Sequence, residues 1–306
     1  MNTIDVQNLG MKFGRFPALS NFSLTVPTGT AMALLGENGA GKTTTLRILA
    51  GIYEPTSGSG TVLDTPLGSL DTPQFQRIGH VSENQQLPLH WTLQQLIDYL
   101  KPLYPNWDDD FCDELVENFE LPLDRKLAAM SRGMQMKASL VSSLAYRPDL
   151  LLLDEPFSGL DPLVREELID GILELMQGGD WTVLLSSHDI NEVERLCDSV
   201  TLIRNGQIEL SEDLDQLQDR FRTWSVTNAS TPAADLPAEW IQVQELSPTS
   251  WTFTDTQHNP EKSSQKIAAI FGENATAEAT TLSLRDIYLT IARQQKKKRL
   301  ALKKSA

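Results

Sequence analysis

The chain has 306 residues, 40% of them hydrophobic and 22% charged, values typical of a globular protein with about two domains. No apolar run approaches the roughly 20 residues that span a bilayer, and the opening MNTIDVQNLG lacks the basic and apolar regions of a signal peptide. The net charge of −15 argues against a broad nucleic-acid surface, which needs clustered Lys and Arg. Intrinsic membrane proteins, collagen-like chains and disulfide scaffolds are therefore excluded.

Two further features of composition concern the cysteines and the C-terminus. Cys112 and Cys197 match no metal or redox spacing, so we expect free thiols in a cytosolic protein.

Residues 293–306 carry seven Lys and Arg and no acid, which makes a basic tail on an acidic body. This tail could contact anionic lipid, or it could be a solvated helix end whose cations complement the helix dipole.

Strands and helices alternate along the first two thirds of the chain. Residues 3–35 are expected to form short strands, with AMALLG as a buried one, and residues 41–50 to form a helix that ends at Gly51. Residues 85–147 are mainly helical in pattern. The buried strand DLLLLD is expected next, followed by a helix from the N-cap Asp161 to about Gln177 and the strand WTVLLSS. A capping box of Asp189 and Glu192 then opens a short helix that ends near Cys197. A hairpin is expected at Asn205-Gly206.

The pattern changes near residues 216–222, where we place a domain boundary. TWSVTN, WIQVQEL and SWTFT are expected to be short strands. One helix is expected from Pro260 to Gly272, and another after the N-cap Ser283, with Asp286 in its first turn. Leu284, Ile287, Tyr288 and Ile291 share one face of the latter. Residues 217–306 are therefore expected to form a small α+β appendage.

The segment GENGAGKT matches the P-loop pattern G-x-x-x-x-G-K-[ST] between a predicted strand and a predicted helix. Glycines let backbone N–H groups converge on phosphate oxygens, and the helix that follows directs its positive end to the same place. Lys42 is expected to reach the β and γ phosphates, and Thr43 to bind Mg²⁺. The candidate loop comprises Gly36, Glu37, Asn38, Gly39, Ala40, Gly41, Lys42, Thr43 and Thr44.

The buried strand LLLLDEP ends in two acids, which is costly unless they are paired or bind a cation. We expect Asp154 to hold Mg²⁺ and Glu155 to activate the attacking water as a general base. With the P-loop, this predicts an NTPase.

Further segments follow in a specific order: SRGMQ about 20 residues before Asp154, SGLDP after Glu155, and His188 at the end of the next strand. Over residues 3–215 the chain resembles the nucleotide-binding domain of ATP-binding cassette (ABC) proteins. The resemblance implies an α/β fold with a RecA-like core, an antiparallel β subdomain and a helical subdomain, in an ATP-binding domain of residues 1–216. It also implies that the protein is an ATPase with ATP and Mg²⁺ as cofactors.

The resemblance also implies roles for individual residues. Phe13 would stack on adenine, with a plain core residue as the less favoured alternative. Ser131, the backbone of Gly133 and Gln135 belong to the signature segment, which would close on the ATP of a second subunit. Asp161 would lie at the dimer interface and also suits an N-cap, and His188 would contact the γ-phosphate.

Two positions depart from the commonest family pattern. LSGGQ is replaced by MSRGMQ, so that Arg132 stands in place of a glycine and Met134 follows Gly133. The glutamine expected after the strand IGHVS corresponds to Glu83, which could still bind Mg²⁺ or its waters, but Gln85 and Gln86 leave the register open. Such variant signatures resemble those of bacterial exporter-type cassettes encoded apart from their membrane subunits.

The leading hypothesis is thus an ATPase subunit that drives a separate transmembrane permease from the cytoplasmic face of the membrane. The subunit is expected to act as a homodimer or heterodimer and to have no nucleic-acid partner. The helical region 85–147, with WTLQQLIDYL and KPLYPNW, would contact the permease or be ordinary core. The alternative is a soluble ABC ATPase acting on ribosomes or DNA. One P-loop, only 88 residues between Lys42 and Ser131, and the acidic body disfavour it. A third possibility, a non-hydrolysing switch, is disfavoured by Glu155 and His188.

Overall fold

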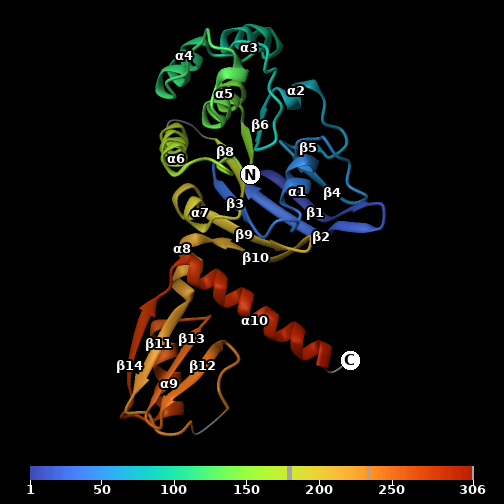
Figure 1. Ribbon diagram of the computed structural model, residues 1–306. Coiled ribbons are helices and arrows are strands. Elements are labelled where there is room, and N and C mark those ends of the chain that lie inside the picture. Colours follow the sequence, from blue (N-terminus) through green and yellow to red (C-terminus); the bar gives the residue numbers. More distant parts are fainter. Residues whose placement is uncertain (178–180, 233–234, 305–306) are drawn as a thin grey trace. The chain divides into compact units, whose positions relative to one another are not determined.

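The computed structural model describes residues 1–177, 181–232 and 235–304. They fall into two compact units, 1–211 and 212–306 (Figure 1). The division lies a few residues before the expected 216–222. Gly178, the expected stop of a helix, lies outside the described residues, as do the side chains of the basic tail beyond residue 294.

The first unit contains an antiparallel sheet in the order β2-β1-β4-β5. Its two long strands are β1 (Asn2–Phe13) and β2 (Phe16–Pro27), joined to β4 (Ser57–Val62) and β5 (Thr65–Pro66). Strands β1 and β2 are longer than the short strands expected in this region. Register shifts along their pairing interrupt the alternation of apolar and polar residues, so the sequence pattern indicated shorter strands.

The main sheet of this unit has the order β10-β9-β3-β8-β7-β6. Neighbouring strands from β9 to β6 pair in parallel. Both faces of this sheet are covered, so β3, β7 and β8 are continuous buried runs rather than alternating ones. The strands are β3 (Ala31–Leu35), β6 (Ile78–Ser82), β7 (Leu150–Asp154), β8 (Thr182–Ser187), β9 (Ser199–Arg204) and β10 (Gln207–Asp213).

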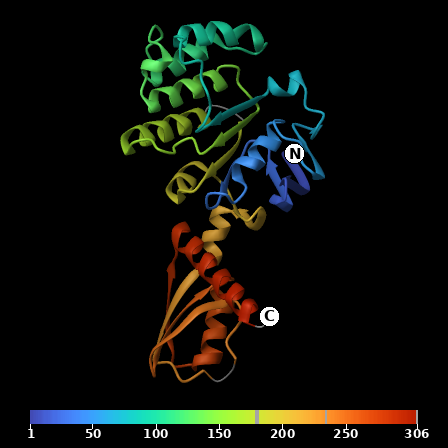
Figure 2. The same cartoon turned by 45° about the vertical axis from the view of Figure 1, so that its right-hand side comes forward.

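Helices α1 (Lys42–Leu49), α6 (Pro162–Gln177) and α7 (Ile190–Leu196) accompany this sheet, and α2 (Thr72–Phe75) is a single short turn. A helical layer of α3 (Leu93–Leu100), α4 (Asp109–Asn118) and α5 (Arg132–Leu144) lies beyond β6, as both ribbon views show (Figures 1 and 2). Two apolar cores result. One joins the helical layer to the sheet, and the other joins α1 to the antiparallel sheet. This is the predicted α/β cassette with its two subdomains.

The second unit is the expected small α+β appendage. Its antiparallel sheet has the order β12-β13-β11-β14, and its helices are α8, α9 and α10. Aromatic rings, among them Trp240 stacked on Phe253 at 4.1 Å, form its core together with Ile267. The bounds are α8 (Leu214–Arg220), β11 (Arg222–Thr227), β12 (Trp240–Ser247), β13 (Ser250–Asp255), α9 (Pro260–Phe271), β14 (Thr276–Thr281) and α10 (Leu284–Lys304).

Most local predictions are confirmed. Asp286 N–H donates to Ser283 Oγ at 3.1 Å, so Ser283 caps α10, and Gly272 ends α9. The capping box at Asp189 is wrong. Asp189 does cap α7, but its own N–H donates to Ser187 Oγ, and the buried Glu192 carboxylate accepts from the same hydroxyl. The edge strand β14 was not expected, because TAEATT is exposed and lacks an apolar alternation.

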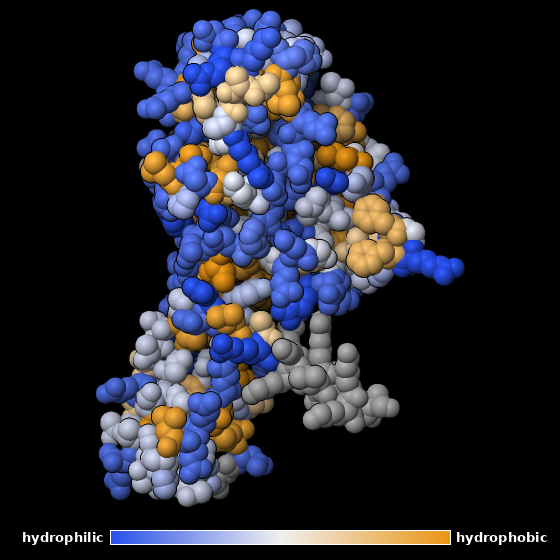
Figure 3. Space-filling view, viewed as in Figure 1, coloured by the Kyte–Doolittle hydropathy of each residue, from blue (hydrophilic) through white to orange (hydrophobic). Residues whose placement is uncertain are grey.

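The described cysteines are free thiols, and burial raises the pKa of Cys112 to about 11. No helix in the described ranges is long and apolar enough to cross a membrane. Hydrophilic side chains dominate the face shown in Figure 3, with hydrophobic ones in small groups.

Candidate functional site

The candidate residues gather at one edge of the main sheet, where parallel strands end. Register pairs Leu35 of β3 with Ser187 of β8, and Asp154 of β7 with both Ser186 and Ser82. The loops after these four strands therefore start side by side. Crevices at the carboxyl ends of parallel strands are the usual ligand sites of such sheets.

The P-loop connects β3 to α1 in a conformation that requires glycine. Gly41 has φ = 116°, and a Cβ there would lie 2.8 Å from the Leu19 side chain. The described residues provide no hydrogen-bond acceptor for the backbone N–H groups of Gly39, Gly41, Lys42 and Thr43. A loop of free N–H groups at a helix N-terminus is an anion-binding arrangement.

A cavity of about 420 Å³ lies beside this loop. Phe13 and Phe16 lie on its wall with Glu83 and Glu155. Phe13 is 45% exposed and meets Tyr53 edge-on at 5.6 Å, so it is not a core residue. The other lining residues are Ala18, Asn38, Gly39, Gly41, Lys42, Thr43 and Thr44, whereas Gly36, Glu37 and Ala40 complete the loop outside the lining.

Lys42 is the buried cation of the site, at 5% exposure. Its Nζ donates to the Gly36 carbonyl at 2.7 Å and lies 2.9 Å from Glu155 Oε1. The other Glu155 oxygen lies 2.6 Å from His188 Nδ1, and His188 is 54% exposed. The three predicted catalytic residues thus form one chain of contacts from the loop to solvent.

Glu155 sits in a left-handed backbone conformation with φ = 52°, which is uncommon for a residue with a Cβ. Two hydrogen bonds to Ser186 hold it: its N–H donates to the Ser186 carbonyl at 3.2 Å and to Ser186 Oγ at 3.1 Å. Sharp backbone turns of this kind concentrate at functional sites. The sequence analysis does not single out Ser186; a hydroxyl residue near the end of the buried strand WTVLLSS is the signal that could have indicated it.

Asp154 and Thr43 have the oxygen atoms that suit Mg²⁺. Asp154 is 4% exposed, and its Oδ1 accepts from Thr43 Oγ1 at 3.0 Å and from Ser186 Oγ at 2.7 Å. Across the described ranges, no group of three or more His, Cys, Asp or Glu could hold a metal. Asp154 and Thr43 provide one carboxylate and one hydroxyl oxygen side by side, which fits an ion that takes one or two protein ligands and the rest from phosphates and water, as Mg²⁺ does.

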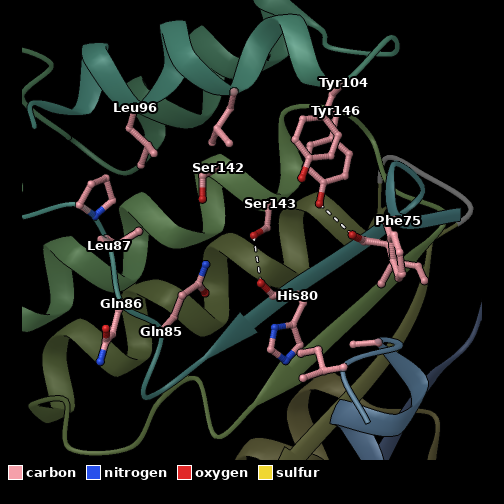
Figure 4. Close-up of a pocket in the computed structure, with 15 residues that line it drawn as sticks. Phe75, His80, Gln85, Gln86, Leu87, Leu96, Tyr104, Ser142, Ser143 and Tyr146 are labelled. Carbon is pink, nitrogen blue, oxygen red and sulfur yellow. Dashed lines mark hydrogen bonds between the residues drawn. The ribbon is translucent and has the colours of Figure 1, made fainter. Parts of the chain in front are cut away.

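The segment after β6 places the three candidates for the family's expected glutamine, Glu83, Gln85 and Gln86, at different sites. Glu83 N–H donates to the Asp154 carbonyl at 3.0 Å, and Glu83 lines the P-loop cavity. Gln85 and Gln86 instead line a second cavity of about 350 Å³ (Figure 4). Only Glu83 of the three thus lies at the candidate site.

The signature segment begins α5. Ser131 caps the helix, with Met134 N–H donating to Ser131 Oγ at 3.2 Å, and Ser131 is exposed. Gly133 is buried against α6, where a Cβ would lie 2.5 Å from Val164 Cγ1. The Gln135 amide donates to the carbonyls of Leu127 and Met130, so its N–H groups hold the preceding turn. Asp161 caps α6 by accepting from Val164 N–H at 3.1 Å.

Comparison with known proteins places these features in a family. The family model described as "ABC transporter" matches residues 19–158. The chain is 31% identical to the ABC transporter ATP-binding protein YtrB of Bacillus subtilis, covering 71% of this chain and 74% of YtrB. It is 33% identical to the sulfate/thiosulfate import ATP-binding protein CysA of Escherichia coli, covering 70% of this chain and 61% of CysA.

Solved structures agree. An ATP-binding subunit of an ABC transporter has a TM-score of 0.64 at 28% identity, covering 71% of this chain and 92% of that one. A dimeric bacterial ABC transporter cassette has a TM-score of 0.62 at 24% identity, covering 69% and 98%. On the motifs, the geometry and these similarities, the chain belongs to the ABC transporter ATP-binding proteins and is an ATPase of that family.

Proposed function

We propose that this protein hydrolyses Mg²⁺–ATP as a dimer at the cytoplasmic face of a membrane. In this proposal ATP hydrolysis drives a separate permease that exports its substrate. The contact chain Lys42–Glu155–His188 beside the P-loop supports the ATPase step. The exporter-type signature favours export, although the similar CysA is named for import. Transport into inside-out vesicles that hold the complex tests the direction; transport only in right-side-out vesicles would contradict export.

In this proposal each polar group at the sheet edge has one task. The P-loop N–H groups and Lys42 bind the β and γ phosphates. Thr43 and Asp154 would hold Mg²⁺, and Glu83 would bind the ion or one of its waters; bound Mg²⁺ would neutralise phosphate charge. Glu155 accepts a proton from the attacking water, and His188 orients that carboxylate through the 2.6 Å contact. Phe13, on the wall of the cavity, would stack on the adenine ring.

The second cavity is the proposed permease site. It lies in the first unit, lined by both the helical layer and β6 (Figure 4). The Tyr104 and Tyr146 rings stack at 3.8 Å on its wall, and Tyr146 Oη donates to the Ile78 carbonyl at 2.9 Å. Ile52 and Phe75 on its lining are 55% and 41% exposed. A partly open groove that carries exposed apolar side chains beside polar ones suits a partner's helix.

Replacing Ile52 by Glu should prevent co-purification with the proposed membrane permease, because a carboxylate would enter the contact. The ATPase activity of the isolated protein should be unchanged. Leu246→Glu, at a 64% exposed leucine in the second unit, is the matched control. Binding of Ile52→Glu at the parent level would exclude the groove as the permease site. Capture of RNA or DNA in place of a membrane protein would favour the soluble alternative.

The proposed dimer is supported by the exposed signature end of α5, because Ser131 is exposed and is not among the residues that line the chain's own P-loop cavity. The variant for testing this is Ser131→Asp, not a change at buried Gly133, where any side chain would strike Val164 within the same chain. Asp preserves the helix cap and adds a negative charge. Asn preserves the cap without charge and is the control.

Ser131→Asp should bind ATP as the parent does but lose ATP-dependent dimerisation, because its carboxylate would oppose a partner's γ-phosphate. Mixing it with Lys42→Ala should restore part of the ATPase activity, since one of the two sites in a mixed dimer is intact. ATP-dependent dimerisation and activity are measured by light scattering and phosphate release. Parent activity in Ser131→Asp alone would contradict a head-to-tail site.

A further inference from the structure

The two positions that depart from the family pattern contact each other. Arg132 Nη2 donates to Glu83 Oε1 at 2.6 Å, although 49 positions separate them in the chain. Their side chains are 53% and 30% exposed. Neither a glycine at 132 nor a glutamine at 83 could form this ion pair, so it exists only because both residues differ from the common pattern.

A third segment adjoins the same guanidinium. Gly159, in SGLDP, has φ = 66°, and a Cβ there would lie 2.5 Å from Arg132 Nη1 and 2.8 Å from its Cζ. The guanidinium therefore rests directly on the Gly159 backbone. One side chain thus joins the segment after β6, the signature helix α5 and the segment after Glu155.

Glu83 has a fixed backbone and a side chain with two possible partners. Its N–H is held by the Asp154 carbonyl at 3.0 Å, which keeps the residue at the sheet edge. Its side chain pairs with Arg132 and also lines the cavity that contains Thr43. A carboxylate shared between a guanidinium and a metal site is attracted to two cations, and stronger binding to one weakens binding to the other.

We propose that Arg132 is a positioning residue that competes with Mg²⁺ for the Glu83 carboxylate, so that metal binding releases the signature helix from the segment after β6. The inference rests on the proposed magnesium role of Glu83. Because the ion pair is largely solvated, its removal should change the apparent Mg²⁺ affinity only by roughly two- to fivefold.

The experiment measures equilibrium binding rather than turnover. In a Glu155→Gln background, binding of trinitrophenyl-ATP is titrated with Mg²⁺. Arg132→Met should lower the Mg²⁺ concentration for half-maximal binding by about two- to fivefold, whereas Arg132→Lys should stay near the parent because it keeps the charge. Arg77→Met is the matched control, since the Arg77–Asp149 pair, at 2.5 Å, lies at the opposite end of β6.

A double variant separates competition from simple charge repulsion. Glu83→Gln alone should raise the Mg²⁺ requirement, and adding Arg132→Met should then have no further effect. If the Arg132→Met shift persists without Glu83, the guanidinium acts through space and the competition is refuted.

The two proposals fail in distinguishable ways. An unchanged Mg²⁺ requirement in Glu83→Gln would remove the metal role of Glu83 and this inference with it. A raised requirement in Glu83→Gln, together with no effect of Arg132→Met, would overturn only the role of Arg132.

Discussion

Replacing Glu155 by Gln is expected to slow ATP hydrolysis by at least about 10²-fold, the scale of a general-base contribution, while ATP still binds. The amide occupies nearly the same volume but cannot accept the proton of the attacking water. It also ends the ion pair of 2.9 Å with Lys42, which frees that cation for phosphate. ATP should therefore persist between two subunits and populate a dimer with ATP and Mg²⁺.

Single-turnover phosphate release and light scattering check these two expectations together. Glu117→Gln, an exposed acid on α4, is the control and should behave as the parent in both. Turnover of Glu155→Gln at the parent rate would show that another group activates the water. Loss of ATP binding would mean instead that Glu155 is needed for the shape of the P-loop cavity.

Lys42→Ala is expected to reduce ATP turnover by at least about 10²-fold, because one preorganised charge at a transferring phosphoryl group contributes on this scale. The structure adds a second consequence. Lys42 is buried and is the cation beside Glu155 Oε1, so its loss leaves that carboxylate without its neutralising partner close to the phosphates. Affinity for ATP should fall together with the rate.

The control is Lys101→Ala, a half-exposed lysine paired with Asp109 on the helical layer. Equilibrium ATP binding and thermal unfolding are measured for both variants. An unchanged unfolding temperature with lost turnover supports the assigned role of Lys42. Unimpaired turnover in Lys42→Ala would contradict the P-loop assignment.

Local sequence patterns predicted helices and strands correctly where a single signal, such as a continuous apolar run or an N-cap residue, was strong. Continuous apolar runs became the buried strands β3, β7 and β8, the predicted N-caps Asp161 and Ser283 began α6 and α10, and α9 began at Pro260 as expected. The edge strand β14 was missed, because an exposed strand held by its pairing to β11 needs no apolar alternation. The Asp189–Glu192 box failed because the Ser187 hydroxyl competes for both groups.

The sequence by itself determined the family, the order of the motifs and the candidate residues, because phosphate and Mg²⁺ chemistry needs particular side chains at short, fixed spacings. Only the tertiary structure decided which of Glu83, Gln85 and Gln86 lies at the P-loop cavity, and it alone paired Glu83 with Arg132. The reason is geometric. The chain turns after β6 ends at Ser82, so the spacing of Glu83, Gln85 and Gln86 along the sequence does not tell which side chain lines which cavity. The contact between Arg132 and Glu83 spans 49 positions and depends on how β6, α5 and the loop after β7 pack together. A local sequence pattern cannot predict such packing.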